Sequence, residues 1–259
     1  MAFRVRAGRR HRPAESFPVS HADDYSARSA REPVPLLRGP VPGLALWLCR
    51  LDLDPQSTAA MARSLSRPER DRAARFGTDA LRSRWIVGRA TLRSLLGAKL
   101  GVDPQAVELK AGRRGRPELA APGGLDFNVS HTQGVALIAL ADALPSATRI
   151  GVDIERADRA VNADRLARKF LTERERAALA PLDADSRRRR FLRLWTCKEA
   201  MSKATGDALS APFRHIEVSM EQEPKLVAGP PPYTPDAWQL CVAAVPPQLI
   251  ATVAMWHTN

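Results

Sequence analysis

The chain has 259 residues and a formal net charge of +12, from 40 Lys and Arg against 28 Asp and Glu. This length suits one large domain or two small ones. The basic balance favours a polyanionic partner: a nucleic acid, an anionic membrane, a phosphorylated ligand or an acidic protein. The sequence lacks an apolar run near the roughly 20 residues that cross a bilayer, and its Arg-rich start does not resemble a secretory signal. We therefore expect a cytoplasmic protein. Three scattered cysteines without a C-x-x-C pair argue against a zinc site.

Residues 1–42 differ from the rest of the chain. They combine a basic run, Arg9-Arg10-His11-Arg12, with many Pro, Ser and Ala residues and show no sustained hydrophobic periodicity. This composition predicts a flexible basic tail.

Residues 43–148 predict a first half of strands and helices. A short apolar run at 44–48 indicates a strand. Ser66 and Glu69 form an S-x-x-E capping box that opens a helix. Apolar residues at helical spacing predict a longer helix over 78–100, which Gly101 would end. Strands at 125–129 and 135–140 flank a hairpin-like T-Q-G connection.

Residues 149–259 predict a second half with a similar outline. A strand over 149–155 precedes a second capping box, Thr172 with Glu175, and a long helix over 186–205. Three strands, at 215–220, 238–245 and 250–256, close the chain. Because strands and helices do not alternate regularly, a doubly wound parallel sheet is disfavoured. We predict the α+β class, with two halves packed together and a ligand site between them.

The segment Ile150–Glu155, I-G-V-D-I-E, places two acids two residues apart on a strand. Side chains alternate across a strand, so the three apolar residues would face the core and Gly151, Asp153 and Glu155 the other side. Two carboxylates on one face repel each other unless a cation or solvent compensates, and oxygen ligands suit Mg²⁺. Gly151 would leave room beside them for a ligand. The alternative is a strand that runs into an exposed turn with both acids solvated.

A second segment, W-T-C-K-E-A-M-S-K over 195–203, lies in the long predicted helix. Trp195, Glu199 and Lys203 follow helical spacing and share one face, whereas Lys198 lies about 100° round the helix from Glu199. Glu199 could then face the two strand acids. The alternative is a surface Glu–Lys pair that contributes only about 0.2–0.5 kcal/mol.

Together these segments resemble the signature of 4′-phosphopantetheinyl transferases of the surfactin-synthetase-activating type. R-G-R-P at 114–117 and F-N-V-S-H at 127–131 resemble two further segments of that family, and the Arg-rich stretch 70–89 is similar to its N-terminal region. The resemblance covers residues 44 to 256. It implies a pseudo-dimer of two similar α+β halves, each a small, mainly antiparallel sheet with helices, and an active site between them.

The resemblance also implies an activity. Such an enzyme transfers the 4′-phosphopantetheine moiety of coenzyme A to a serine of an apo carrier protein and releases adenosine 3′,5′-bisphosphate. It depends on Mg²⁺. The partners would be coenzyme A and acyl or peptidyl carrier domains, with no nucleic acid and no membrane. A monomer that serves secondary metabolism is typical of single-chain members.

The site residues follow from the same resemblance. Asp153, Glu155 and Glu199 would bind Mg²⁺, and Lys198 and Lys203 would contact the pyrophosphate. Glu199, Lys203 and Asp153 would form the catalytic set, with Glu199 as the base, directly or through a metal-bound water. The adenine and 3′-phosphate end of coenzyme A would contact Arg72, Arg84, Gly115, Arg116, Pro117, Asn128, Ser130 and His131. Arg70, Arg75 and Arg82, in the same arginine-rich stretch, are alternatives to Arg72 and Arg84.

Two other functions compete with this interpretation. A nucleic-acid-binding protein would explain the charge and the basic tail, but the sequence has no recognisable binding module. Another Mg²⁺-dependent phosphotransferase is weakened by the lack of a P-loop motif. The run Arg187–Arg190 could steer acidic carrier proteins, or it could be a solvated helix start.

Overall fold

The computed structural model describes residues 34–36, 42–121, 124–142, 144, 147–221 and 223–258. Most of the predicted tail, residues 1–33 and 37–41, lies outside the described residues. Within that tail, the short strand β1 (Val34–Leu36) pairs antiparallel with the next strand. Among the described residues, helices long and apolar enough to cross a membrane are absent.

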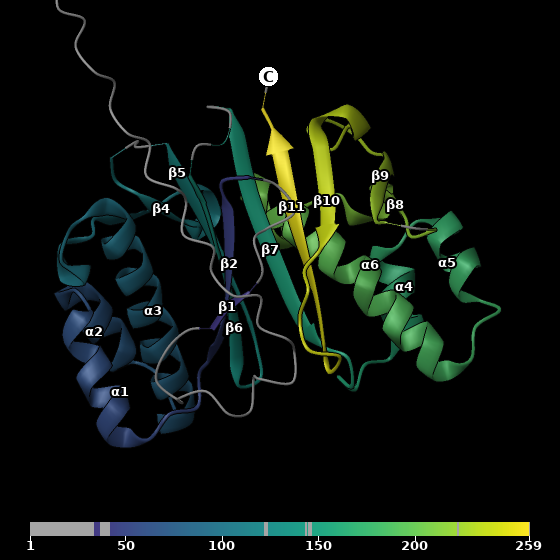
Figure 1. Ribbon diagram of the computed structural model, residues 1–259. Coiled ribbons are helices and arrows are strands. Elements are labelled where there is room, and N and C mark those ends of the chain that lie inside the picture. The colour runs from purple at the N-terminus through teal and green to yellow at the C-terminus, as the bar shows by residue number, and fades with distance from the viewer. Residues whose placement is uncertain are drawn as a thin grey trace, which may run out of the picture.

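The first half contains a four-stranded antiparallel sheet in the order β1-β2-β6-β5. Its main strands are β2 (Leu44–Arg50), β5 (Leu125–Thr132) and β6 (Val135–Asp142), and α1 (Pro55–Met61), α2 (Arg67–Ala73) and α3 (Asp79–Leu100) lie to one side of it (Figure 1). The predicted capping box starts α2, and α3 ends at Gly101 as predicted. A small hairpin, β3 (Leu109–Ala111) with β4 (Pro117–Leu119), has no counterpart in the sequence-based expectation.

The second half contains a three-stranded antiparallel sheet in the order β10-β11-β7. Its strands are β7 (Thr148–Arg156), β10 (Trp238–Val242) and β11 (Leu249–His257), and its helices are α4 (Ala163–Phe170), α5 (Glu173–Leu179) and α6 (Ala184–Thr205). The second capping box starts α5 as predicted. A hairpin of β8 (Glu217–Ser219) and β9 (Lys225–Ala228) lies beside α5. Short 3₁₀ turns occur at Ala62–Ser64, Pro104–Ala106, Arg113–Gly115, Ala208–Ser210, Phe213–His215 and Pro235–Ala237.

Three apolar clusters hold these elements in layers. One joins the inner faces of the two sheets, with Leu48 and Leu137 on one side and Val152 and Val253 on the other. A second packs α3 against the outer face of the first sheet, and a third packs α6 against the second sheet. Since burial of apolar surface contributes about 25 cal/mol per Å², this shared core stabilises both halves together. The predicted α+β class, with two mainly antiparallel halves, is confirmed.

The two sheets also meet along their edges, where β5 lies beside β7. β5 is an edge strand of the first sheet, and β7 is an edge strand of the second sheet. Alternate side chains of β5, those of Asp126, Asn128 and Ser130, point toward β7 and accept hydrogen bonds from its backbone. The donors are the N–H groups of Ile150, Val152 and Ile154, at 2.8, 3.0 and 3.3 Å respectively. Side chains therefore satisfy backbone groups of β7 that a strand edge would leave open.

Candidate functional site

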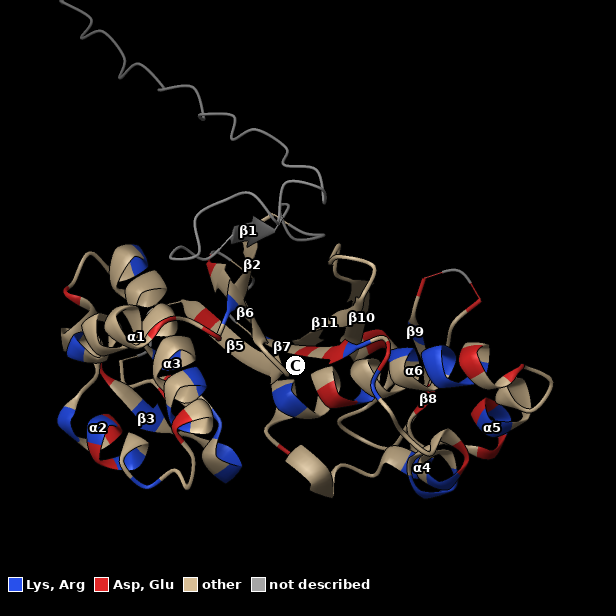
Figure 2. Ribbon diagram, turned by 90° about the horizontal axis from the view of Figure 1, so that it is seen from below, with Lys and Arg blue, Asp and Glu red and all other residues tan. Residues whose placement is uncertain are grey.

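Three acidic side chains and one lysine gather where β7 lies against the C-terminal half of α6. Figure 2 shows acidic and basic segments of these two elements side by side near the middle of the molecule. Asp153 and Glu155 come from β7 and are buried, whereas Glu199 and Lys203 come from α6 and are partly exposed. The Nζ of Lys203 donates to Asp153 Oδ1 and to Ser130 Oγ, each at 2.7 Å. The structure thus brings together one residue of the first half and four of the second.

Gly151 explains why the strand and the helix approach so closely. A Cβ added to Gly151 would lie 2.0 Å from the carbonyl oxygen of Ala200 and 2.7 Å from the nitrogen of Ala204, both in α6. Only glycine leaves space for the helix backbone at this point. The expectation that Gly151 leaves room for a ligand was wrong, because α6 itself occupies that room. The close packing brings the acids of β7 next to Glu199.

The acidic cluster is short of positive charge and of hydrogen-bond donors. Asp153 Oδ2 and Glu199 Oε1 are buried and have no hydrogen-bond partner among the described residues, whereas such atoms are nearly always satisfied in proteins. Burial, together with the nearby Asp153 and Glu155 carboxylates, raises the pKa of Glu199 to about 7, against the opposing effect of Lys203. Burial and Asp153 also raise the pKa of Glu155.

These residues fit a divalent cation by donor chemistry. The atoms available to bind a metal are carboxylate oxygens, which Mg²⁺ prefers. A cation between them would offset the charge repulsion that adds to the effect of burial on the pKa values of Glu155 and Glu199. Within the described part of the chain, no three His, Cys, Asp or Glu side chains are already arranged as a ready metal site. The ammonium of Lys203, bound to Asp153 Oδ1, supplies the positive charge in this arrangement.

Sequence reasoning missed two groups that contact Glu155. Arg159 forms an ion pair with Glu155 Oε1, and the hydroxyl of Thr132 donates to Glu155 Oε2 at 3.5 Å. The four-residue spacing of Glu155 and Arg159 was a usable signal, because such pairs often meet. The approach of Thr132, from the first half, had no local signal.

The predicted residues of β5 divide by side-chain direction. Asn128 uses its Oδ1 to accept the N–H of Val152 at 3.0 Å, and is buried. Ser130 Oγ donates to Asp153 Oδ1 at 2.8 Å, and so belongs to the acidic cluster. His131 follows Ser130 on the opposite side of the strand and is exposed.

Two other predicted coenzyme A contacts are buried against protein. Lys198 is 0% exposed, and its Nζ donates to Glu175 Oε2 at 2.6 Å and to the carbonyl oxygens of Phe213 and Phe170 at 2.8 and 3.1 Å. It therefore faces α5, away from Glu199, and its position does not support the predicted pyrophosphate contact. Consecutive side chains on a helix point about 100° apart, which explains why Lys198 and Glu199 face different neighbours. Arg116 is 7% exposed and is hydrogen-bonded to protein oxygen atoms.

The remaining predicted residues lie in the first half. Arg84 of α3 makes a two-point ion pair with Asp52, with its Nε 2.6 Å from Oδ1. The guanidinium of Arg72 lies over the ring of Trp85, 5.6 Å from its centroid. Two further predicted residues flank Arg116: Gly115 ends a 3₁₀ turn and Pro117 begins β4. Their contacts with coenzyme A stay predictions.

The run Arg187–Arg190 is largely engaged within the protein. Arg187 pairs with Asp164 at 3.2 Å and Arg188 with Asp185 at 2.9 Å. A third member, Arg190, donates to the carbonyl oxygen of Met220 at 3.1 Å. These partners reduce the charge available to steer an acidic protein.

Comparisons with known proteins agree with the motifs. Residues 149–253 match the family model described as the 4′-phosphopantetheinyl transferase superfamily, and residues 54–142 match the model described as 4′-phosphopantetheinyl transferase, N-terminal. The 4′-phosphopantetheinyl transferase HetI of a Nostoc species is 39% identical over 214 residues, which cover 77% of this chain and 85% of HetI. The 4′-phosphopantetheinyl transferase Sfp of Bacillus subtilis is 26% identical over 159 residues, covering 61% of this chain and 68% of Sfp.

Among solved structures, the holo-[acyl-carrier-protein] synthase of Thermotoga maritima aligns with 43% of this chain and 64% of its own, at 18% identity and a TM-score of 0.36. The resemblance seen in the sequence motifs is confirmed by the two family models and by the extent of the match to HetI. The chain belongs to the 4′-phosphopantetheinyl transferase family and is a transferase enzyme.

Proposed function

We propose that the site between β7 and α6 transfers the 4′-phosphopantetheine group of coenzyme A to a serine of an apo carrier protein. The products are the holo carrier protein and adenosine 3′,5′-bisphosphate. One observation carries the assignment to this site: Asp153 Oδ2 and Glu199 Oε1 are both buried here with no hydrogen-bond partner among the described residues. A site that leaves two carboxylate oxygens unsatisfied is suited to a charged ligand that completes it.

Asp153, Glu155 and Glu199 would hold Mg²⁺. All three offer oxygen ligands, and burial together with the neighbouring carboxylates raises the pKa values of Glu155 and Glu199. When bound, the ion neutralises phosphate charge and stabilises the leaving phosphate. Arg159, paired with Glu155 Oε1, fixes that carboxylate at the edge of the site.

Lys203 and Glu199 have separate parts in the transfer. Lys203 is 27% exposed, so its ammonium can exchange the hydroxyl of Ser130 for an oxygen of the entering pyrophosphate. There it favours the negative charge that builds up on the leaving group. The Oε1 of Glu199 has no hydrogen-bond partner among the described residues, and it can accept the proton of the attacking serine directly or through a water. The proton then rests on the Glu199 carboxylate as the bond from serine oxygen to phosphorus forms.

The test is a transfer assay in which mass spectrometry measures the intact mass of the carrier protein. The protein is incubated with coenzyme A and an apo carrier protein, with Mg²⁺ or with a chelator. We expect the carrier to gain the mass of one phosphopantetheine arm, only when the divalent ion is present. Asp153→Asn should abolish the gain, whereas Asp158→Asn, an exposed acid beyond the end of β7, should not.

No gain with several carriers would contradict the proposed function. Tight DNA binding in its place would support the nucleic-acid alternative, for which retention on duplex DNA is a simple assay. The proposal also includes a cytoplasmic monomer without membrane or nucleic-acid partners. Size-exclusion chromatography with light scattering tests the oligomeric state.

A further inference from the structure

Residues 113–116, here called the arginine loop, lie in the first half but contact the C-terminal end of α6 in the second. Arg116 Nε donates to the carbonyl oxygen of Lys203 at 3.1 Å. Arg114 Nη1 donates to the carbonyl oxygen of Asp207 at 2.6 Å, and Arg113 Nη2 lies 2.8 Å from Asp207 Oδ1. Arg116 thus binds a carbonyl in the last turn of the helix that carries Glu199 and Lys203, and Arg113 and Arg114 bind Asp207, two residues beyond its end.

The end of a helix explains why arginines bind there. The last four carbonyl groups of an α-helix have no partner within it, and they carry the negative end of its dipole. The carbonyl of Lys203 is one of these four, since α6 ends at Thr205. The N–H of Asp207, which lies four residues further on, donates instead to Ser202. Arg116 therefore supplies the hydrogen bond that the Lys203 carbonyl would otherwise lack.

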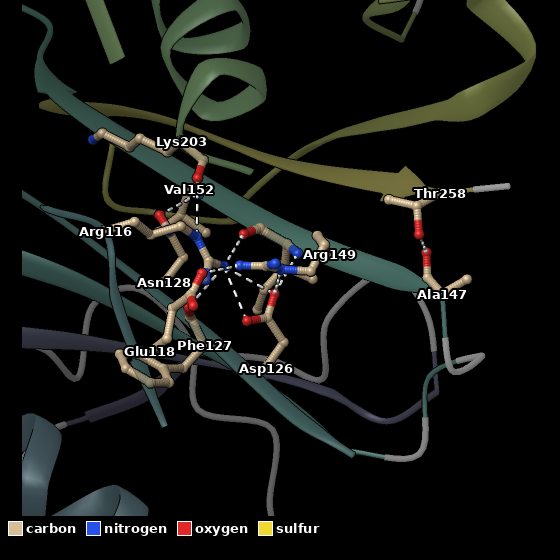
Figure 3. A network of polar contacts seen from close by, with 11 residues as sticks. Arg116, Glu118, Asp126, Phe127, Asn128, Ala147, Arg149, Val152, Lys203 and Thr258 are labelled. Carbon is tan, nitrogen blue, oxygen red and sulfur yellow. Dashed lines mark hydrogen bonds and ion pairs between the residues drawn. The ribbon is translucent and has the colours of Figure 1, made fainter. Parts of the chain in front are cut away.

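Arg116 is also fixed from the side away from α6 (Figure 3). Its Nη2 lies 3.0 and 2.9 Å from the two carboxylate oxygens of Asp126, 3.1 Å from the carbonyl of Phe127 and 3.0 Å from the carbonyl of Ile150. The guanidinium thereby connects β5, β7 and α6. Its remaining nitrogen, Nη1, is buried and has no hydrogen-bond partner among the described residues, but it forms an ion pair with the carboxylate of Glu118, 3.6 Å away. A buried nitrogen beside an acid is a poor place for a phosphate.

We propose that Arg116 is a positioning residue whose side chain fixes the last turn of α6 against the first half and does not bind the 3′-phosphate of coenzyme A. This inference rests on the proposed transferase function. The backbone of Lys203 is held by Arg116, while its side chain reaches Ser130 and Asp153. Movement of this turn would displace the ammonium of Lys203 and the carboxylate of Glu199, one helical turn earlier, from the acids of β7.

Kinetics with two forms of the co-substrate separate positioning from binding. For Arg116→Gln we measure kcat and KM with coenzyme A and with 3′-dephospho-coenzyme A, which lacks the 3′-phosphate. We expect kcat to fall about 10-fold or more, as for the loss of a charge-assisted hydrogen bond. KM for coenzyme A should stay within about 3-fold, and the preference for coenzyme A over the dephospho form should match the wild type. The exposed Arg174→Gln serves as the matched control and should change neither constant.

A loss of that preference, with a raised KM for coenzyme A only, would show that Arg116 binds the 3′-phosphate and would overturn the proposal. If Arg116→Gln does not fold, Asp126→Asn supplies the test, because it loosens Arg116 and cannot itself have bound a phosphate. It should lower kcat with unchanged preference, and an unchanged kcat would overturn the proposal. A wild-type protein without transferase activity would instead refute the proposed function.

Discussion

Two lysines of α6, five positions apart, have opposite surroundings. Lys198 is fully buried, and its three hydrogen bonds go to one carboxylate and two carbonyl oxygens. Lys203 is 27% exposed and contacts Ser130 and Asp153, beside two carboxylate oxygens that have no hydrogen-bond partner among the described residues. We call the side of α6 that carries Lys198 the completed face, because Lys198 and Glu175 are paired there. We call the side that carries Lys203 the incomplete face, because Asp153 Oδ2 and Glu199 Oε1 have no hydrogen-bond partner among the described residues.

This difference supports a structural role for the face that carries Lys198 and the proposed chemical role for the face that carries Lys203. A buried charge that is fully paired stabilises a fold and has no capacity left for a ligand. A buried carboxylate oxygen that lacks a donor costs free energy unless a ligand compensates for it. The pair Lys198–Glu175 therefore fixes α6 to α5, and the acids around Lys203 are available for chemistry. The following experiments test this division in order of decreasing expected effect.

The largest effect is expected on the completed face. Lys198→Met leaves Glu175 buried without its cation, which typically costs about 3–5 kcal/mol. The measurement is the free energy of unfolding in urea. Lys225→Met, at an exposed position, is the control and should change it by less than about 0.5 kcal/mol. The double variant Lys198→Met with Glu175→Gln should recover part of the loss. A stable Lys198→Met protein with a raised KM for coenzyme A would instead restore the predicted pyrophosphate contact.

On the incomplete face we expect loss of activity without loss of stability. Glu199→Gln removes a ligand charge and the proposed base, and should lower kcat at least about 100-fold, or about 2.7 kcal/mol of transition-state stabilisation. Coenzyme A binding, measured by calorimetry, should be largely kept. Glu173→Gln, an exposed position at the start of α5, is the matched control. Near-normal turnover of Glu199→Gln would remove Glu199 from the catalytic set.

The sequence predicted those parts of the fold that have local signals. Both capping boxes and the helix end at Gly101 depend on residues within one or two turns, and all were confirmed. The hydrogen bonds from β7 to side chains of β5 join residues 24 positions apart. They could not be predicted, because no periodicity shows which strand edges meet. The direction of Lys198 was missed for a related reason, since its partner Glu175 was already explained as a capping residue.

Gly151 is the residue through which the two elements of the incomplete face meet. Gly151→Ala places a Cβ 2.0 Å from the carbonyl oxygen of Ala200 and must displace α6. We expect a loss of about 1–3 kcal/mol in the free energy of unfolding, as for overpacked cores, with reduced turnover. Gly77→Ala is the matched control, because, apart from its chain neighbours, no described residue has an atom within 4 Å of the added Cβ. Equal stability of the two variants would show that the close approach is not required.

The smallest effect concerns the pH dependence of the metal-free protein. The pKa of Glu199 is raised to about 7 in the folded state by burial, Asp153 and Glu155, whereas an unfolded Glu titrates near about 4.3. Between these values the folded state binds more protons than the unfolded one, so Glu199 lowers stability as pH rises through this window. Glu199→Gln should therefore unfold at higher urea than the wild type at about pH 8, and the difference should shrink toward about pH 4. Urea titrations in chelator at both pH values measure it.

The effect of Mg²⁺ on the free energy of unfolding tests the same difference between the two faces. At about pH 8 it should stabilise the wild type, because a ligand that binds only the folded state raises the free energy of unfolding. The stabilisation should be weaker for Glu199→Gln, which has lost one of the three carboxylates. For Glu175→Gln, on the completed face, Mg²⁺ should stabilise as much as in the wild type. A pH-independent difference between wild type and Glu199→Gln, together with no effect of Mg²⁺ on either, would mean that the unsatisfied oxygens do not form a cation site.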